Sequence, residues 1–336
     1  MKTLRNLWAL LKSFDPLQLL RIIGDWKSMT RVHYLYAAID SGLLDALPAS
    51  RDELISRLDV SRLEMLDALL NVGLSIKELK VKRNVYSIKG KRSKSMLGRS
   101  SDVLRALVEA NVTYYASSYR NFNERMRGAT KGDELKVSGD VIARLSELGA
   151  PLIRLFVKDL VKGGDVVRIL EVGCGEGIYL KAAYDANPNA TGIGVDIDPD
   201  VVDHAKRNIK NWVISDRFSV ICGDIFNPPP ELSGKYDLIT LYNIVYYFDE
   251  KMRMALFSLL KEMLARGGAL AITSSTYDPG SDVFSANLNM ATSSMQGLSP
   301  LPGVDDLMLQ LMRVGFGNVK AERIMRGSSE YGIVAR

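Results

Sequence analysis

A glycine-rich turn in the middle of the chain follows an apolar, β-branched run. The run covers residues 166–172, and the turn, residues 173–177, holds three glycines in five positions. Glycine lets the backbone turn sharply and lets a ligand approach without meeting a Cβ atom. One acid, Glu171, stands just before the turn, and a second, Asp196, ends the next apolar run. The pattern indicates a ligand site with acids on two sides.

The two acids indicate a ligand with hydroxyl groups and a positive charge. An acid about 20 residues after such a turn can accept hydrogen bonds from both hydroxyls of a ribose, which fits Asp196. Dinucleotide sites place a pyrophosphate at the helix start, and Glu171 would repel that group. S-adenosylmethionine carries an ammonium, a sulfonium, a ribose and an adenine, and it has no phosphate. The pattern therefore favours this ligand over a nicotinamide dinucleotide.

A βαβ unit is needed to bring the turn and the two acids together. Residues 166–172 have the composition of a strand buried on both faces, residues 178–186 that of a helix, and residues 191–195 that of a second strand. The carboxyl ends of parallel strands meet at one edge of a sheet, where nucleotide-like ligands bind. Further strands are expected over residues 219–222, 236–242, 269–274, 318–324 and 331–335.

In this order the turn, the acids and the strands resemble the class I S-adenosylmethionine-dependent methyltransferases. The resemblance implies an α/β fold with a Rossmann-like, seven-stranded sheet whose last strand inserts antiparallel, and S-adenosyl-L-methionine as the cofactor. It also implies that Asp224 contacts the adenine amine and that Ile225 lies beside the ring. The implied cofactor-binding residues are Glu171, Gly173, Gly175, Gly177, Asp196, Ile197, Asp224, Ile225 and Asn243.

The N-terminal part predicts a mostly helical domain with a short hairpin. Residues 51–58 and 62–74 have the pattern of helix, turn and helix, and residues 80–88 that of a hairpin, which together form a winged-helix pattern. The layout resembles the N-terminal dimerisation domain of small-molecule O-methyltransferases of the plant phenylpropanoid and bacterial polyketide type, which implies a homodimer. We expect this domain over residues 1–100, connecting helices that cover the active site over 101–164, and the methyltransferase domain over 165–336.

A winged helix also suggests a second class, a DNA-binding regulator that keeps a cofactor fold. The hairpin region is basic, but the second helix of the winged-helix pattern carries Glu64 and Asp67, which a phosphate would repel. The net charge of +5 is also modest for a nucleic-acid-binding protein. We therefore favour dimerisation over nucleic acid. Contact of the basic hairpin region with an anionic membrane stays open as an alternative. The basic residues of this region are Lys77, Lys80, Lys82, Arg83, Lys89, Lys91, Arg92, Lys94 and Arg99.

The first residues, 1–23, carry apolar side chains at near-helical spacing with basic residues between them. The stripe predicts an amphipathic helix that lies on a membrane surface or packs on protein, and we favour packing. Pro16 is expected to break or bend this helix.

Methyl transfer in the resembling O-methyltransferases often uses a histidine shortly after the fourth strand. The two histidines here, His33 and His204, lie elsewhere, and Tyr246 or Tyr247 stands at that place. A tyrosine with an ordinary pKa of about 10 is a poor base at neutral pH. We assign Tyr246 a positioning role. The acceptor atom is oxygen or carbon, with nitrogen left open, and transfer proceeds by in-line displacement without a catalytic histidine.

The acceptor is expected to be small and hydrophobic, like a quinone, a polyketide or an isoprenoid. The segment 284–312 holds four methionines, which adapt to irregular apolar shapes, although methionines at helical spacing also fill cores. No cluster of Cys and His residues indicates a metal site. Candidate substrate residues are Tyr115, Tyr119, Tyr247, Asn289 and Met290.

The composition is that of an ordinary globular chain, with 47% hydrophobic and 25% charged residues. No apolar run reaches the roughly 18 residues of a membrane span, and the N-terminus lacks the features of a signal peptide. The two cysteines, Cys174 and Cys222, are expected to be small buried residues in a reducing compartment. The chain is therefore expected in the cytoplasm, with peripheral membrane contact left open.

Overall fold

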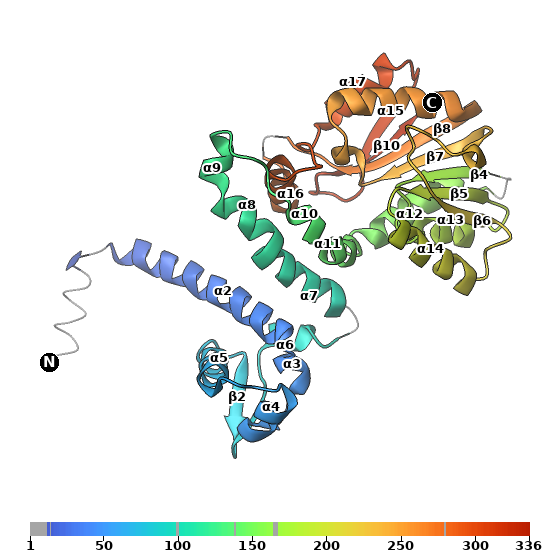
Figure 1. Cartoon of the computed structure of the whole chain (residues 1–336). Helices are drawn as coiled ribbons and strands as arrows, with labels where there is room; N and C mark the ends of the chain where they lie inside the picture. Colours follow the sequence, from blue (N-terminus) through green and yellow to red (C-terminus); the bar gives the residue numbers. More distant parts are fainter. Residues whose placement is uncertain (1–11, 14, 99–100, 138, 164–166, 279) are drawn as a thin grey trace. The chain divides into compact units, whose positions relative to one another are not determined.

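The computed structural model describes residues 12–13, 15–98, 101–137, 139–163, 167–278 and 280–336 (Figure 1). Most of the amphipathic stretch expected at the N-terminus lies outside these residues. The chain divides into two compact units, each described here by itself. One comprises Met1–Ser117 with Ser138–Leu145, and the other Ser118–Val137 with Ser146–Arg336.

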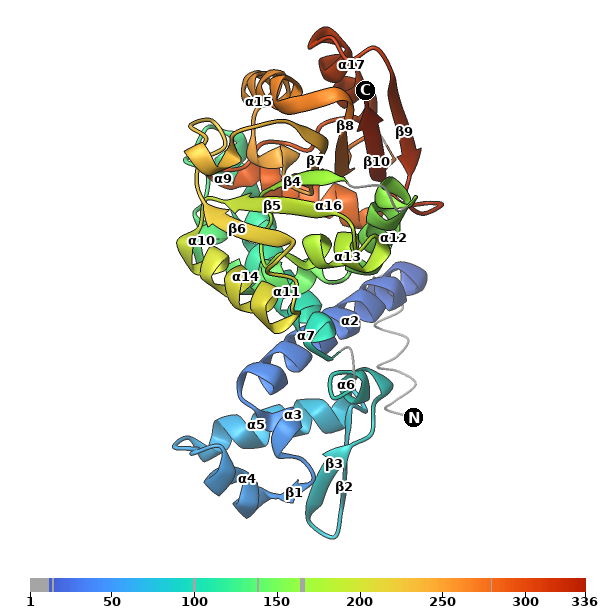
Figure 2. The same cartoon turned by 90° about the vertical axis from the view of Figure 1, so that its right-hand side faces the viewer.

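The first unit contains the predicted pair of helices and the hairpin. Strand β3 lies between β1 and β2 in a three-stranded antiparallel sheet. Figure 2 shows the β2–β3 hairpin with its turn at the end far from α6. The elements are α2 (Pro16–Asp40), α3 (Leu43–Ala46), β1 (Ala49–Ser50), α4 (Arg51–Arg57), α5 (Leu63–Ser75), β2 (Leu79–Lys82), β3 (Val85–Ile88), α6 (Lys91–Ser95), α7 (Ser101–Ala110), the π-helical turn Asn111–Tyr115 and α11 (Gly139–Ser146).

Local sequence explains where the helices of this unit begin. Asp15 caps α2 by accepting hydrogen bonds from the backbone N–H groups of Leu17 and Gln18, and Pro16 occupies the first helical turn. Proline is tolerated there because that N–H has no partner within the helix. Lys12 and Ser13 are helical, Asp15 is not, and Pro16 begins α2, so the expected break of the helix at Pro16 is confirmed. Ser50 and Glu53 form a reciprocal capping box at the start of α4.

The second unit is built on a seven-stranded sheet in the order β6-β5-β4-β7-β8-β10-β9. The strands pair in parallel except β10, which runs antiparallel between β8 and β9, as the resemblance implies. The strands are β4 (Arg168–Val172), β5 (Thr191–Asp196), β6 (Phe218–Cys222), β7 (Tyr236–Tyr242), β8 (Leu264–Ser275), β9 (Val319–Arg323) and β10 (Glu330–Ala335).

Helices cover both faces of this sheet (Figure 1). On one face, Leu170, Ile239 and Leu270 pack with apolar residues of α15 (Glu250–Met263) and α17 (Val304–Arg313). On the other face, side chains of the sheet pack against α12 (Ala150–Val161), α13 (Ile178–Ala186) and α14 (Pro199–Asn211). Two buried faces explain why the strands are near-continuous apolar runs. The remaining helices are α8 (Ala116–Arg120), α9 (Phe122–Met126), α10 (Glu134–Val137), α16 (Val283–Ser294) and the 3-10 turns Pro230–Leu232 and Val245–Tyr247.

The helices of the described chain are too short or too polar for a membrane span. Among the expected connecting helices, α7 is followed by the π-helical turn Asn111–Tyr115 and then by α8, and Tyr119 of α8 belongs to the second unit. Such turns commonly occur near functional sites.

Candidate functional site

The glycine turn lies at the carboxyl end of β4, beside the end of β5. The N–H groups of Gly173 and Cys174 both donate to the Val195 carbonyl, at 2.8 and 3.1 Å, and fasten the turn to β5. Gly173, Gly175 and Gly177 have φ values of +67°, +52° and +77°, which L side chains rarely adopt. A Cβ atom on Gly175 would meet no other atom within 4 Å, so this part of the turn borders open space.

Asp196 ends β5 and binds the turn with its carboxylate. Its Oδ2 accepts the N–H of Gly175 at 2.9 Å, and its Oδ1 accepts the N–H of Asp198 at 3.1 Å. Each carboxylate oxygen can accept a second hydrogen bond, so the group keeps capacity for two hydroxyls. The next residue, Ile197, is 72% exposed at the same edge. The structure thus brings together the turn and the acid that the sequence predicts to bind a ribose.

Glu171 lies in β4, one residue before the end of the strand, and is 2% exposed. Its Oε1 atom is buried and has no hydrogen-bond partner. Burial and the negative charge of Asp196 raise the pKa of Glu171 well above its ordinary value. A buried carboxylate oxygen without a partner is costly, and a cationic ligand would lower that cost. The unpaired oxygen therefore fits a ligand with an ammonium group.

The segment after β6 is tied to the same edge. The Gly223 N–H donates to the Asp196 carbonyl at 2.9 Å, and Asp224 accepts the N–H of Phe226 at 2.9 Å. Ile225 is buried in the core beneath the sheet, whereas Phe226 is 37% exposed. The Phe226 ring packs edge-to-face on Phe248, with centroids 5.7 Å apart. These two aromatic rings, which the sequence analysis did not select, lie beside the predicted adenine residue.

Asn243 follows β7 with a φ of +55°, and its N–H donates to the Thr273 carbonyl at 2.8 Å. Its Oδ1 atom is buried and has no partner. The rings of Tyr246 and Tyr247 stack at 5.4 Å with an interplanar angle of 26°. Burial and the charge of Asp196 raise the pKa of Tyr247. The Tyr247 side chain is 40% exposed, and the sequence assigns it to the acceptor.

The predicted substrate residues fall in different places. Tyr115 belongs to the first unit, where its ring packs edge-to-face on Tyr114. In the second unit, the Tyr119 hydroxyl donates to Asn287 Oδ1 at 2.8 Å and joins α8 to α16. The Asn289 Oδ1 atom accepts a hydrogen bond from the Leu301 N–H, and Met290 on the same helix is half-buried. The Tyr246 carbonyl accepts the Ser299 N–H at 2.8 Å and fixes the loop after α16 to the turn after β7.

Glu330 is a half-buried acid at this edge that the sequence analysis missed. It begins β10 opposite Ser275, whose hydroxyl donates to Glu330 Oε2 at 2.9 Å, and its Oε1 has no partner. Burial raises its pKa, aided by Asp282, while Ser275 and Asn243 oppose the rise. The sequence carries no motif for this residue. Only the antiparallel register, which places the start of β10 beside the end of β8, brings it to the site.

The two cysteines differ in exposure. Cys174 is buried under the turn, and burial raises the pKa of its thiol, whereas Cys222 is exposed at the end of β6. The prediction that both are buried is therefore wrong for Cys222. Its Sγ lies 3.7 Å from the Ile197 carbonyl, at the same edge of the sheet as the glycine turn.

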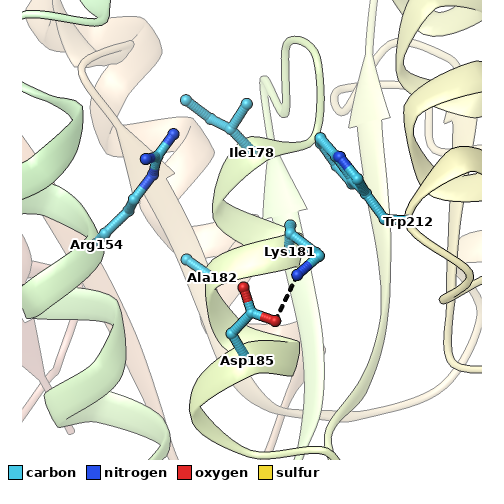
Figure 3. A pocket seen from close by; sticks show the side chains of 6 residues that line it. All are labelled: Arg154, Ile178, Lys181, Ala182, Asp185 and Trp212. Carbon is cyan, nitrogen blue, oxygen red and sulfur yellow. Dashed lines mark hydrogen bonds and ion pairs between the residues drawn. The ribbon is translucent and has the colours of Figure 1, made fainter.

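A surface cavity of about 340 Å³ lies along α13, between Arg154 of α12 and Trp212, which follows α14 (Figure 3). Its two basic side chains already have acidic partners, because Lys181 pairs with Asp185 and Arg154 with Glu147. The glycine turn does not line this cavity, so we do not assign the S-adenosylmethionine site to it. Within the described residues, no group of three or more Cys, His, Asp and Glu side chains could hold a metal ion. The lining residues are Arg154, Ile178, Lys181, Ala182, Asp185 and Trp212.

Comparison with known proteins gives matches of two kinds. Residues 169–268 match the model of a family described as a methyltransferase domain. Malonyl-(acyl-carrier protein) O-methyltransferase 1 from Ilyobacter polytropus is 36% identical over 105 residues, which are 31% of this chain and 37% of the relative. The match thus spans little more than a third of that relative's length.

Solved structures resemble the chain over nearly its whole length. Mitomycin 7-O-methyltransferase MmcR has a TM-score of 0.75 at 13% identity and covers 99% of both chains. Human N-acetylserotonin methyltransferase, solved in complex with SAM, has a TM-score of 0.71 at 18% identity, over 96% of this chain and 98% of that one. At these identities the likeness concerns the fold.

Proposed function

We propose that this chain, which carries a methyltransferase domain over residues 169–268, is an S-adenosylmethionine-dependent methyltransferase that acts on a small hydrophobic molecule. One observation carries the proposal. Glu171, with an unpaired buried oxygen, and Asp196, with spare acceptor capacity, flank a glycine turn that borders open space. This set of groups matches a ligand with a cationic amino-acid end and a ribose.

Each residue of the edge has a proposed part in donor binding. Glu171 compensates the ammonium, Asp196 accepts the ribose hydroxyls, and Asp224 and Ile225 are assigned to the adenine. Phe226 and Phe248 add an aromatic border beside them. Gly173, Gly175 and Gly177 keep the turn free of side chains.

S-adenosylmethionine supplies a methyl group already activated by a sulfonium. The protein therefore chiefly aligns the acceptor atom with the methyl carbon and excludes water. The rings of Tyr246 and Tyr247 stack on each other shortly after β7, where Asn243 precedes them in the chain. The Tyr246 carbonyl is hydrogen-bonded to the loop after α16. We assign the two tyrosines to positioning of the acceptor, since the chain has no histidine after β7, and Asn243 stays with the cofactor-binding residues.

The acceptor is proposed to be a quinone, polyketide or isoprenoid-like molecule that is methylated on oxygen or carbon. The half-buried Met290 and its neighbours on α16 offer an adaptable apolar border. Purified protein incubated with labelled methyl donor and cell extract would identify the product by mass. Calorimetry with S-adenosylhomocysteine and with NAD tests the donor first. Binding of NAD alone would overturn the proposal.

We also propose a homodimer formed through the first unit. Helix α2 exposes a series of large apolar side chains that its own unit leaves uncovered. A DNA-binding role has less support, because Arg51 is already paired with Asp67 of α5, and Met65 on the same helix is apolar and 64% exposed. The exposed apolar residues of α2 are Leu17, Leu20, Ile22, Ile23, Trp26 and Met29.

A further inference from the structure

The basic charge of the chain is concentrated in one part of the first unit, the segment Lys77–Lys94. This segment holds eight of the 44 lysines and arginines and only one acid, Glu78. The other 36 basic residues face 38 acids, so the rest of the chain is slightly acidic. The net charge of +5 therefore arises from β2, β3 and α6 and their flanks.

The acid within the segment is turned away from solvent. The side chain of Glu78 is 4% exposed, and it binds Arg31 at 3.2 Å and the Ser93 hydroxyl at 2.8 Å. The eight basic side chains are all exposed, and none forms an ion pair within the described part of the chain. They are Lys77, Lys80, Lys82, Arg83, Lys89, Lys91, Arg92 and Lys94. An unneutralised patch of this kind attracts an anionic surface.

The tip of the hairpin combines charge with apolar side chains. Arg83 and Asn84 both have positive φ, at +48° and +61°, which defines a tight two-residue turn of the primed type. Val81 and Val85 on the two sides of the turn are 47% and 40% exposed. Lys82 pairs with Val85 across the ladder, so a cation stands beside an exposed valine. Apolar side chains among cations suit the boundary between lipid head groups and acyl chains.

We propose that the β2–β3 hairpin and α6 form a docking surface for an anionic lipid bilayer. The cations approach the head groups, and Val81 and Val85 enter the interface. A nucleic acid offers the same negative charge but no apolar layer, and the adjoining helix α5 presents Glu64, Leu63 and Met65 to solvent. A hydrophobic acceptor, as in the proposed function, would be drawn from such a bilayer, although the docking surface does not depend on that function.

Co-sedimentation of the full-length protein with vesicles tests the proposal. We expect binding to phosphatidylcholine vesicles that contain phosphatidylglycerol, and little binding to phosphatidylcholine alone. Each basic residue near such a surface contributes about 1 kcal/mol, so K80E/K82E/R83E should weaken binding about a hundredfold or more. The matched control is K206E/R207E/K210E on α14, where three exposed cations are reversed and the net charge changes equally. Equal loss in both variants would overturn the proposal.

Two further arms separate lipid from nucleic acid. V81S/V85S keeps every charge and should weaken vesicle binding several-fold. Raising the salt from about 0.1 M to about 1 M shortens the Debye length from about 10 Å to about 3 Å and should release most of the protein. If the protein ignores anionic vesicles, or if a single-stranded RNA binds while V81S/V85S changes nothing, the bilayer assignment is wrong. Circular dichroism and S-adenosylhomocysteine binding report that each variant is folded, independently of the docking result.

Discussion

The backbone N–H of Gly175 donates a 2.9 Å hydrogen bond to Asp196 Oδ2 and joins the turn after β4 to the last residue of β5. The carboxylate therefore holds the turn, and in the proposed function it also receives the ribose of S-adenosylmethionine. D196N keeps an oxygen for Gly175 but loses the charge. Hydrogen bonds to charged groups contribute about 1.5–3 kcal/mol, so S-adenosylhomocysteine should bind about 10- to 100-fold more weakly in calorimetry. D203N on the exposed face of α14 should bind normally.

Gly175 permits a sharp test of the open space beside the turn. G175A places a methyl group where no protein atom lies within 4 Å, at a φ of +52°. The strain is of order 1 kcal/mol, and the methyl group enters the space assigned to the donor. Gly267, near the start of β8, is the matched control. It has a φ of +80°, and a Cβ atom there would also meet no atom within 4 Å. Both variants should lose similar thermal stability, but only G175A should lose S-adenosylhomocysteine binding.

Glu171 links donor binding to pH-dependent stability. In the folded protein its pKa is raised, so the folded state keeps a proton that the unfolded chain releases near pH 4.5. This contribution to stability is present below the unfolded pKa and is lost as pH rises through the folded pKa. E171Q removes the ionisation and should raise the melting temperature of ligand-free protein more at pH 8 than at pH 5, by a few degrees.

The same variant should lose the stabilisation that S-adenosylhomocysteine gives to the wild type. E322Q changes an exposed acid on β9 and should have neither effect. A pH-independent melting difference between E171Q and wild type would contradict the burial argument. Retained ligand stabilisation would contradict the role in ammonium binding.

Tyr246 should matter for transfer and not for the donor. Y246A removes the ring that stacks on Tyr247 and should lower the rate of label incorporation from a labelled methyl donor in extract about tenfold or more. S-adenosylhomocysteine affinity should stay within a factor of about two, because the proposed function assigns the ring to positioning of the acceptor. Y246F keeps the stacking and should retain most of the rate. A fall in donor affinity would instead assign Tyr246 to the donor.

The dimer proposal rests on the uncovered apolar face of α2. L20D/W26D places two charges on this face and should convert a dimer into a monomer in analytical ultracentrifugation. Both side chains are more than 60% exposed within the chain, so the monomer should keep its fold. M126D, at an exposed apolar position on α9 outside α2, is the control and should remain dimeric. A monomeric wild type would refute the proposal.

The sheet could be predicted well because its signals are local. The expected fourth strand coincides with β7, and the third differs from β6 by one residue. The apolar runs and the glycine turn determine these elements over short stretches of chain. The antiparallel last strand was implied by the resemblance, and no local periodicity distinguishes it.

The acceptor side could be predicted less well, because it depends on contacts between distant segments. Glu330 was missed since a polar residue at the start of a strand has the same pattern as a loop. The hydrogen bond between the side chains of Tyr119 and Asn287 joins segments that are 168 residues apart in the sequence. Phe226, not Ile225, is the exposed side chain after Asp224, because Ile225 packs into the core from the turn that follows β6.

The unequal burial of the two cysteines gives the protein a natural attachment point. A thiol reagent should reach Cys222, which is exposed, and spare Cys174, whose buried thiol resists ionisation. A fluorophore on Cys222 would stand next to Ile197, at the border of the proposed ribose site. Occupancy of that site could then be followed by a change in emission from the unmutated chain, without knowledge of the molecule that receives the methyl group.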